Sequence, residues 1–108
     1  MSVRRRVLLD ENLPTDLRRW LPSVEAISAE YMGWKGFRNG ELCRLAQAEG
    51  FNVLVTADRL LAQAYNAWSL MGCGYVTSNR FPVLWPAVDR IDAACQEVLP
   101  GKLFKVSL

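Results

Sequence analysis

The stretch VLLDENLP, residues 7–14, ends an apolar run in two adjacent carboxylates, Asp10 and Glu11. A second apolar run, NVLVT at residues 52–56, is followed two residues later by Asp58. Neither run alternates between apolar and polar residues, which is typical of strands covered on both faces, as in a parallel sheet. We therefore predict two buried strands, each followed by an acidic residue.

Strand-like and helix-like segments alternate along nearly the whole chain, which predicts an α/β fold with a mostly parallel sheet. The clearest helix is residues 83–99, where apolar residues recur at steps of three and four before a Pro-Gly pair. Residues 31–40 mix three glycines with aromatic residues and are predicted as a loop. The predicted strands are residues 6–9, 24–29, 52–56, 74–77 and 103–106, and the other predicted helices are residues 15–20, 41–49 and 59–68.

The composition restricts the chemistry that the chain can perform. Its 108 residues predict one domain spanning 1–108. The absence of histidine excludes histidine bases and histidine-ligated zinc, so a metal site would rely on carboxylates, which favour hard cations such as Mg²⁺ or Mn²⁺. Three widely spaced cysteines without a C-x-x-C pair disfavour structural zinc and disulfides.

The same composition predicts a soluble, cytoplasmic protein with no membrane association. No stretch approaches the ~20 apolar residues that cross a bilayer. Arg4, Arg5 and Arg6 are followed by too few apolar residues for a signal peptide. The net charge of +2 permits nucleic-acid binding without requiring it.

Asp10 and Asp58 are the first candidates for a functional site. Ligands of parallel α/β sheets bind beyond the carboxyl ends of the strands, near the point where strand order reverses. If the two strands are neighbours, the two carboxylates share one edge, and a divalent cation would relieve their repulsion. Glu11 would add a further carboxylate. Two structural interpretations remain open, because Asp58 would also cap the following helix and Asp10 would also accept turn hydrogen bonds.

The segment RNGEL, residues 38–42, offers further candidates at the start of a helix. Asn39 suits an N-cap and Glu41 suits the first turn, yet either would also serve as a third metal ligand at the sheet edge. Arg38, Arg59 and Arg80 lie next to predicted strand ends or loops, where they would bind a phosphodiester backbone or simply face solvent.

The aromatic residues of the 31–40 loop complete the candidate set. Trp34 and its neighbours would stack on unpaired bases or pack over their own helices.

The motifs VLLDENLP, GWKGFRNGELCRLAQAEGF and VLVTADR together resemble the PIN-like domains, in particular a compact bacterial and archaeal subgroup often suspected of being toxin–antitoxin components. The resemblance implies a doubly wound, Rossmann-like three-layer sandwich with a parallel sheet of about five strands. It also implies a ribonuclease that uses Mg²⁺ or Mn²⁺, acts on single-stranded RNA, binds an antitoxin protein and forms a homodimer.

Residue by residue, the resemblance is incomplete. Asp10 matches the family's first acid, and Asp58 matches the acid after the strand that ends in threonine. The family's helix-start acid falls on Asn39 when Ala46 is aligned with its alanine, and Glu41 would compensate for the missing charge. Leu60 stands where many relatives carry another aspartate.

Two other classes of function remain open. A PIN-like domain with a reduced acidic site would bind RNA or a protein partner without turnover. A receiver-like phospho-acceptor would also use Asp10, Glu11 and Asp58, with Thr77 and Lys105 as further candidates, although the Lys-Pro step of receivers is absent because Val106 follows Lys105.

Overall fold

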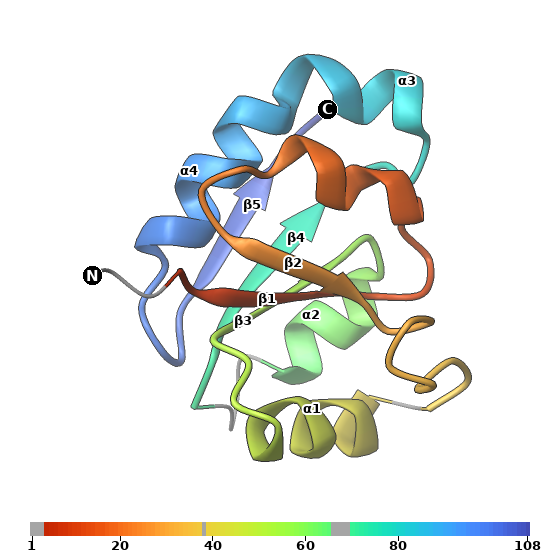
Figure 1. Cartoon of the computed structure of the whole chain (residues 1–108), viewed down its shortest axis with the longest axis vertical. Coiled ribbons are helices and arrows are strands. Elements are labelled where there is room, and N and C mark those ends of the chain that lie inside the picture. The colour runs from red at the N-terminus through yellow and green to blue at the C-terminus, as the bar shows by residue number, and fades with distance from the viewer. Residues whose placement is uncertain (1–3, 38, 66–69) are drawn as a thin grey trace.

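The computed structural model describes residues 4–37, 39–65 and 70–108, except for the side chains of Asn39 and Tyr65. Its centre is a five-stranded parallel sheet (Figure 1). The order across the sheet is β2-β1-β3-β4-β5, and all four pairings are parallel. The predicted α/β fold is therefore confirmed. The strands are β1 Arg6–Leu9, β2 Glu25–Ser28, β3 Val53–Thr56, β4 Gly72–Val76 and β5 Leu103–Val106.

Helical segments connect these strands. In the described ranges, four are α-helices and two are short 3₁₀ turns, in keeping with the short connections of compact domains. None of the helices in the described ranges has both the length and the apolar character needed to cross a membrane. The segments are η1 Thr15–Trp20, α1 Asn39–Ala48, α2 Arg59–Tyr65, α3 Phe81–Leu84, η2 Trp85–Ala87 and α4 Val88–Glu97.

The predicted helix at residues 83–99 is three elements rather than one. Pro86 lies within η2 and has no N–H for an α-helical hydrogen bond, so a 3₁₀ turn separates α3 from α4. The end of the predicted 59–68 helix falls on residues 66–69, outside the described part of the chain. The predicted 31–40 loop gives way to α1 at Asn39.

Each face of the sheet has its own core, as expected for a sheet with helices on both sides. Side chains alternate along a strand, so Val7 and Leu9 of β1 point to one face and Leu8 to the other. On the first face they pack with η1, η2 and α4, and on the second Leu8 packs with α1 and α2. This arrangement is compatible with the expected three-layer sandwich (Figure 1).

Arg5 and Arg6 secure one helix on each face. Arg5 donates from its guanidinium to the carbonyls of Cys95, Gln96 and Val98 at 2.8–2.9 Å, at the end of α4. Arg6 donates to the carbonyl of Glu49, just beyond α1. Helix C-termini have unpaired carbonyls and a partial negative charge, so both arginines complete a helix end.

Strand order reverses between β1 and β3, which positions the candidate site. The chain runs from β1 outward to β2 and then returns to the other side of β1 as β3. Leu9 is in register with Val55, so the segments after these two strands leave the sheet side by side. This is the type of position where ligands bind in open parallel sheets.

Candidate functional site

Asp10 lies at the carboxyl end of β1 with only 7% of its surface exposed. Its backbone N–H donates to the carbonyl of Val55 at 2.9 Å, which continues the β1–β3 pairing by one residue. One carboxylate oxygen accepts the N–H of Glu11 at 2.8 Å, and the other accepts the hydroxyl of Thr56 at 2.7 Å. The carboxylate is thus held in one orientation from both of its oxygens.

Thr56 connects this carboxylate to Asp58. Its buried hydroxyl donates to Asp10 and accepts the backbone N–H of Asp58 at 2.9 Å. The side chain of Asp58 in turn accepts the N–H groups of Leu60 and Leu61 at 2.9 and 3.2 Å through Oδ1. Asp58 is therefore the N-cap of α2, and Oδ2 takes no part in these capping bonds.

The electrostatic environment of Asp10 favours its neutral form. Burial is the largest effect and raises the pKa of this carboxyl above its ordinary value of 3.8. The hydrogen bonds from Thr56 and Glu11 oppose that shift, while the negative charges of Glu11 and Asp58 add to it. Among the described residues, no basic side chain offsets this shift.

A pocket of about 280 Å³ lies beside these acids. Two polar contacts shape its rim: Glu11 Oε1 accepts the N–H of Gly36 at 3.1 Å, and Asn12 Oδ1 accepts the N–H of Ala57 at 3.4 Å. The first contact ties the loop before α1 to the end of β1. The lining residues are Asp10, Glu11, Asn12, Phe37, Leu42, Asp58 and Leu61.

The pocket can offer oxygen ligands to a hard cation, but few of them. No three side chains from His, Cys, Asp and Glu form a metal-binding group within residues 4–37, 39–65 and 70–108. Mg²⁺ commonly binds proteins through one or two carboxylates and fills its other positions with water and substrate phosphate. Asp10 and Asp58 could supply the two carboxylates of such a site, with water and phosphate filling the other positions around the cation.

Cys43 and Cys73 are buried thiols whose neutral form is favoured at neutral pH. Burial raises the pKa values of Cys43 and Cys73 to about 12, with a further contribution from the negative charge of Asp10 to each. A thiol binds metal as the thiolate, which burial disfavours here. Both cysteines pack as apolar side chains in the second core.

Two further predicted site residues belong to α1, and the side chain of one of them, Asn39, is outside the described part of the chain. Glu41 is exposed on α1 and does not line the pocket, and Asn39 is the first residue of α1. Trp34 is half-buried and packs edge-on against Phe51, with 6.0 Å between ring centroids, in the second core. Its surroundings match the packing interpretation better than base stacking.

The predicted arginines are only partly described. Arg59 is exposed directly after Asp58, and Arg80 is exposed before α3, in the segment after β4. Arg38 lies outside the described residues. The two described arginines thus follow strands at the same sheet edge as the pocket.

The receiver-like alternative finds little geometric support. Thr77 follows β4, but its hydroxyl accepts the N–H of Leu108 at 2.8 Å. Lys105 lies inside β5 rather than beyond its end.

Thr56 is the site residue that sequence analysis missed. Its signal was present, because a hydroxyl at the end of a fully apolar strand needs a hydrogen-bond partner when buried. Naming that partner required the pairing of β1 with β3.

Comparison of the chain with models of known protein families, with characterised proteins and with solved structures gives no match. The resemblance to PIN-like domains therefore rests on the sequence motifs alone.

Proposed function

We propose that the pocket beyond β1 and β3 binds Mg²⁺ or Mn²⁺ and that the protein is a metal-dependent endoribonuclease acting on single-stranded RNA. The observation that carries the proposal is that Asp10 and Asp58 line one pocket at the reversal of strand order, with Thr56 bonded to the Asp10 carboxylate and to the backbone N–H of Asp58. The substrate class and a role as the toxin of a toxin–antitoxin pair, with an antitoxin protein as partner, follow from the motif resemblance.

The chain's own residues would divide the work. Asp10 would hold the cation, since Thr56 and the Glu11 N–H already fix its orientation. Asp58 would contribute Oδ2 while Oδ1 continues to cap α2. When bound, the cation would lower the pKa of a water ligand and stabilise negative charge on the phosphate. Arg59, exposed beside Asp58, would contact the RNA backbone.

The test is cleavage of a labelled single-stranded RNA with Mn²⁺, before and after Asp10→Asn. We expect a loss of about 100-fold or more, because metal-ion stabilisation is worth several kcal/mol and each 1.36 kcal/mol is tenfold in rate. Equal rates for the two proteins would remove Asp10 from the mechanism.

Asp58 needs a paired test, because it also caps α2. Asp58→Asn keeps a good N-cap, whereas Asp58→Ala should lower the free energy of unfolding by about 1 kcal/mol. If both variants lose activity while only the alanine variant loses stability, the carboxylate acts at the site and not merely in the helix. Glu41→Gln is the control: it lies outside the pocket lining and should leave cleavage unchanged.

A second candidate function is RNA or partner binding without turnover. It is favoured by the small number of carboxylates, one of which is shared with a helix cap. RNA binding with no cleavage and no thermal stabilisation at millimolar Mg²⁺ would favour this function, because a cation bound to the folded state must stabilise it.

A further inference from the structure

The outer edge of β2 carries backbone groups without partners. Glu25 and Ala29 donate their N–H groups to β1, to the carbonyls of Arg5 and Leu9, both at 2.8 Å. Because backbone groups alternate in direction along a strand, the N–H and C=O groups of Ala26 and Ser28 point away from β1. Only the Ser28 carbonyl has a hydrogen bond in the described chain, from Met32 N–H at 3.2 Å.

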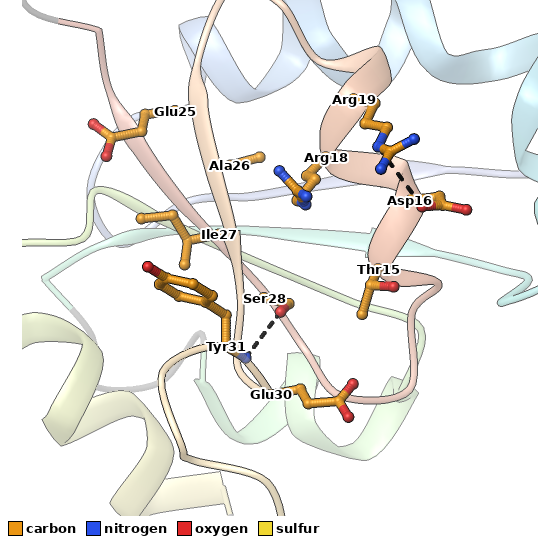
Figure 2. Close-up of a pocket in the computed structure, with 10 residues that line it drawn as sticks. All are labelled: Thr15, Asp16, Arg18, Arg19, Glu25, Ala26, Ile27, Ser28, Glu30 and Tyr31. Atoms are coloured by element: carbon orange, nitrogen blue, oxygen red, sulfur yellow. Dashed lines mark hydrogen bonds and ion pairs between the residues drawn. The ribbon is translucent and has the colours of Figure 1, made fainter.

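A hollow of about 640 Å³ runs along this same edge, more than twice the volume of the acidic pocket (Figure 2). It is lined by residues of η1, by all four residues of β2, and by Glu30 and Tyr31. In Figure 2, η1 stands on one side of β2, while Ile27 and Tyr31 lie on the other. The free edge therefore lies in a groove with two different walls.

The walls differ in chemistry. On the η1 wall, Arg18 is exposed and forms no ion pair within the described chain, and Figure 2 draws its guanidinium between η1 and β2. Its neighbour Arg19 forms an exposed ion pair with Asp16, with 3.8 Å between Nε and Oδ1. On the opposite wall, Ile27 is half-buried and Tyr31 is 82% exposed. One wall offers a cation and the other offers apolar and aromatic surface.

We propose that this groove binds an extended peptide segment of a partner protein, which adds to β2 as a sixth strand. Strand addition takes its affinity from backbone hydrogen bonds and its selectivity from alternate side chains. The bound segment would place an acidic side chain towards Arg18 and apolar side chains towards Ile27 and Tyr31. This partner site is separate from the acidic pocket and does not depend on the proposed nuclease activity.

Charge argues against two other occupants. A second copy pairing antiparallel through β2 would bring the two η1 segments to the same face, so that Arg18 and Arg19 of each copy would meet like charges. RNA would meet Glu25 and Glu30 at the two ends of the groove. A peptide with alternating residues can keep its acidic side chains on the η1 wall beside Arg18 and turn apolar side chains to the wall where Glu25 and Ile27 lie, whereas RNA carries negative charge along its whole length (Figure 2).

The probe is a fluorescein-labelled heptapeptide of alternating valine and glutamate, titrated with the protein by fluorescence anisotropy. We expect a Kd below about 1 mM. A peptide in which lysine replaces glutamate should bind at least tenfold more weakly. A third peptide, methylated on the backbone nitrogens that would pair with β2, should not bind, because it cannot donate the strand hydrogen bonds.

Protein variants localise the binding. Arg18→Glu should weaken it at least tenfold, whereas Arg90→Glu, the same charge change at an exposed residue of α4, should leave it unchanged. Ala26→Pro removes an N–H that points away from β1, a position where edge strands tolerate proline. It should abolish binding while the thermal unfolding profile stays cooperative, and if this variant does not fold, the methylated peptide gives the same test.

Four results would overturn the proposal. They are no binding up to about 1 mM, equal binding of the methylated peptide, displacement of the peptide by poly(U), and a dimer in sedimentation that Ala26→Pro dissociates. The last two would assign the groove to RNA and to a second copy of this chain, respectively.

Discussion

The two ends of β1 carry charged pairs of opposite sign, and their surroundings differ. At the start, Arg5 and Arg6 lie on opposite faces and each donates to carbonyls at the end of a helix. At the other end, Asp10 is buried with two hydrogen bonds and has no basic partner among the described residues, and Glu11 is exposed. The arginines thus have partners of opposite partial charge, whereas the described part of the chain gives the carboxylate neutral hydrogen-bond donors only.

This difference separates a structural role from a functional one. Charges that meet helix-end carbonyls stabilise the fold. A buried carboxylate whose pKa is raised by burial and by other carboxylates opposes folding, and such groups concentrate at binding and catalytic sites. We therefore expect substitutions of the arginines at the start of β1 to lower the free energy of unfolding, and substitution of Asp10 at its other end to raise it.

Arg5→Met should lower the free energy of unfolding more than any other substitution discussed below. It removes three bonds from a charged donor to the carbonyls that end α4, and we expect the free energy of unfolding to fall by about 2–3 kcal/mol. Urea denaturation at neutral pH measures this loss. Arg4→Met is the adjacent control: Arg4 is exposed with one 3.3 Å bond to the Pro22 carbonyl, so its loss should stay within about 0.5 kcal/mol. Similar losses for both would show that the helix end does not need Arg5.

Arg6→Met should give a smaller loss, about 1 kcal/mol. It removes one bond to the Glu49 carbonyl and a contact with the Phe51 ring, whose centroid lies 4.3 Å from the guanidinium carbon. Since Arg5 and Arg6 act on opposite faces, the double variant should be additive within about 0.5 kcal/mol. A strongly non-additive result would mean that the two helix ends are coupled through β1.

The fold could be predicted from the sequence because the strongest signals are local. Two uninterrupted apolar runs and the alternation of strand and helix are sufficient for a parallel α/β sheet. The division of residues 83–99 was harder to predict, because the apolar period continues through Pro86 and outweighed the proline, which does mark where the 3₁₀ turn separates the two α-helices.

The part of the candidate site that could be predicted from the sequence is the pair of acidic residues that follow β1 and β3. Asp10 and Asp58 meet because parallel neighbouring strands finish at one edge, a consequence of topology alone. The link through Thr56 and the helix-end contacts of Arg5 required tertiary structure, because their partners lie 46 and 90 or more residues away. Glu41 illustrates the limit at helices: α1 begins two residues earlier than predicted, and Glu41 faces solvent.

Asp10→Asn should raise the free energy of unfolding, unlike the arginine substitutions, and by the smallest amount of the three. The raised pKa means that the folded protein binds this proton more strongly than the unfolded chain does. The free energy of unfolding therefore falls as pH rises from 3.8 through the raised pKa, and it remains lower at neutral pH. Asparagine has no such charge to bury, so the metal-free variant should gain stability at neutral pH, by less than about 1 kcal/mol.

Urea denaturation in EDTA from about pH 4 to pH 8 tests this sign, since the variant should lose that part of the pH dependence. Glu97→Gln is the control, because this exposed carboxylate of α4 does not contribute to the pKa of Asp10. Added Mg²⁺ should reverse the order by stabilising only the wild-type protein. If Asp10→Asn instead lowers stability across the whole range, Asp10 is a turn acceptor whose contacts are complete, as those of Arg5 are, and the contrast between the two ends of β1 disappears.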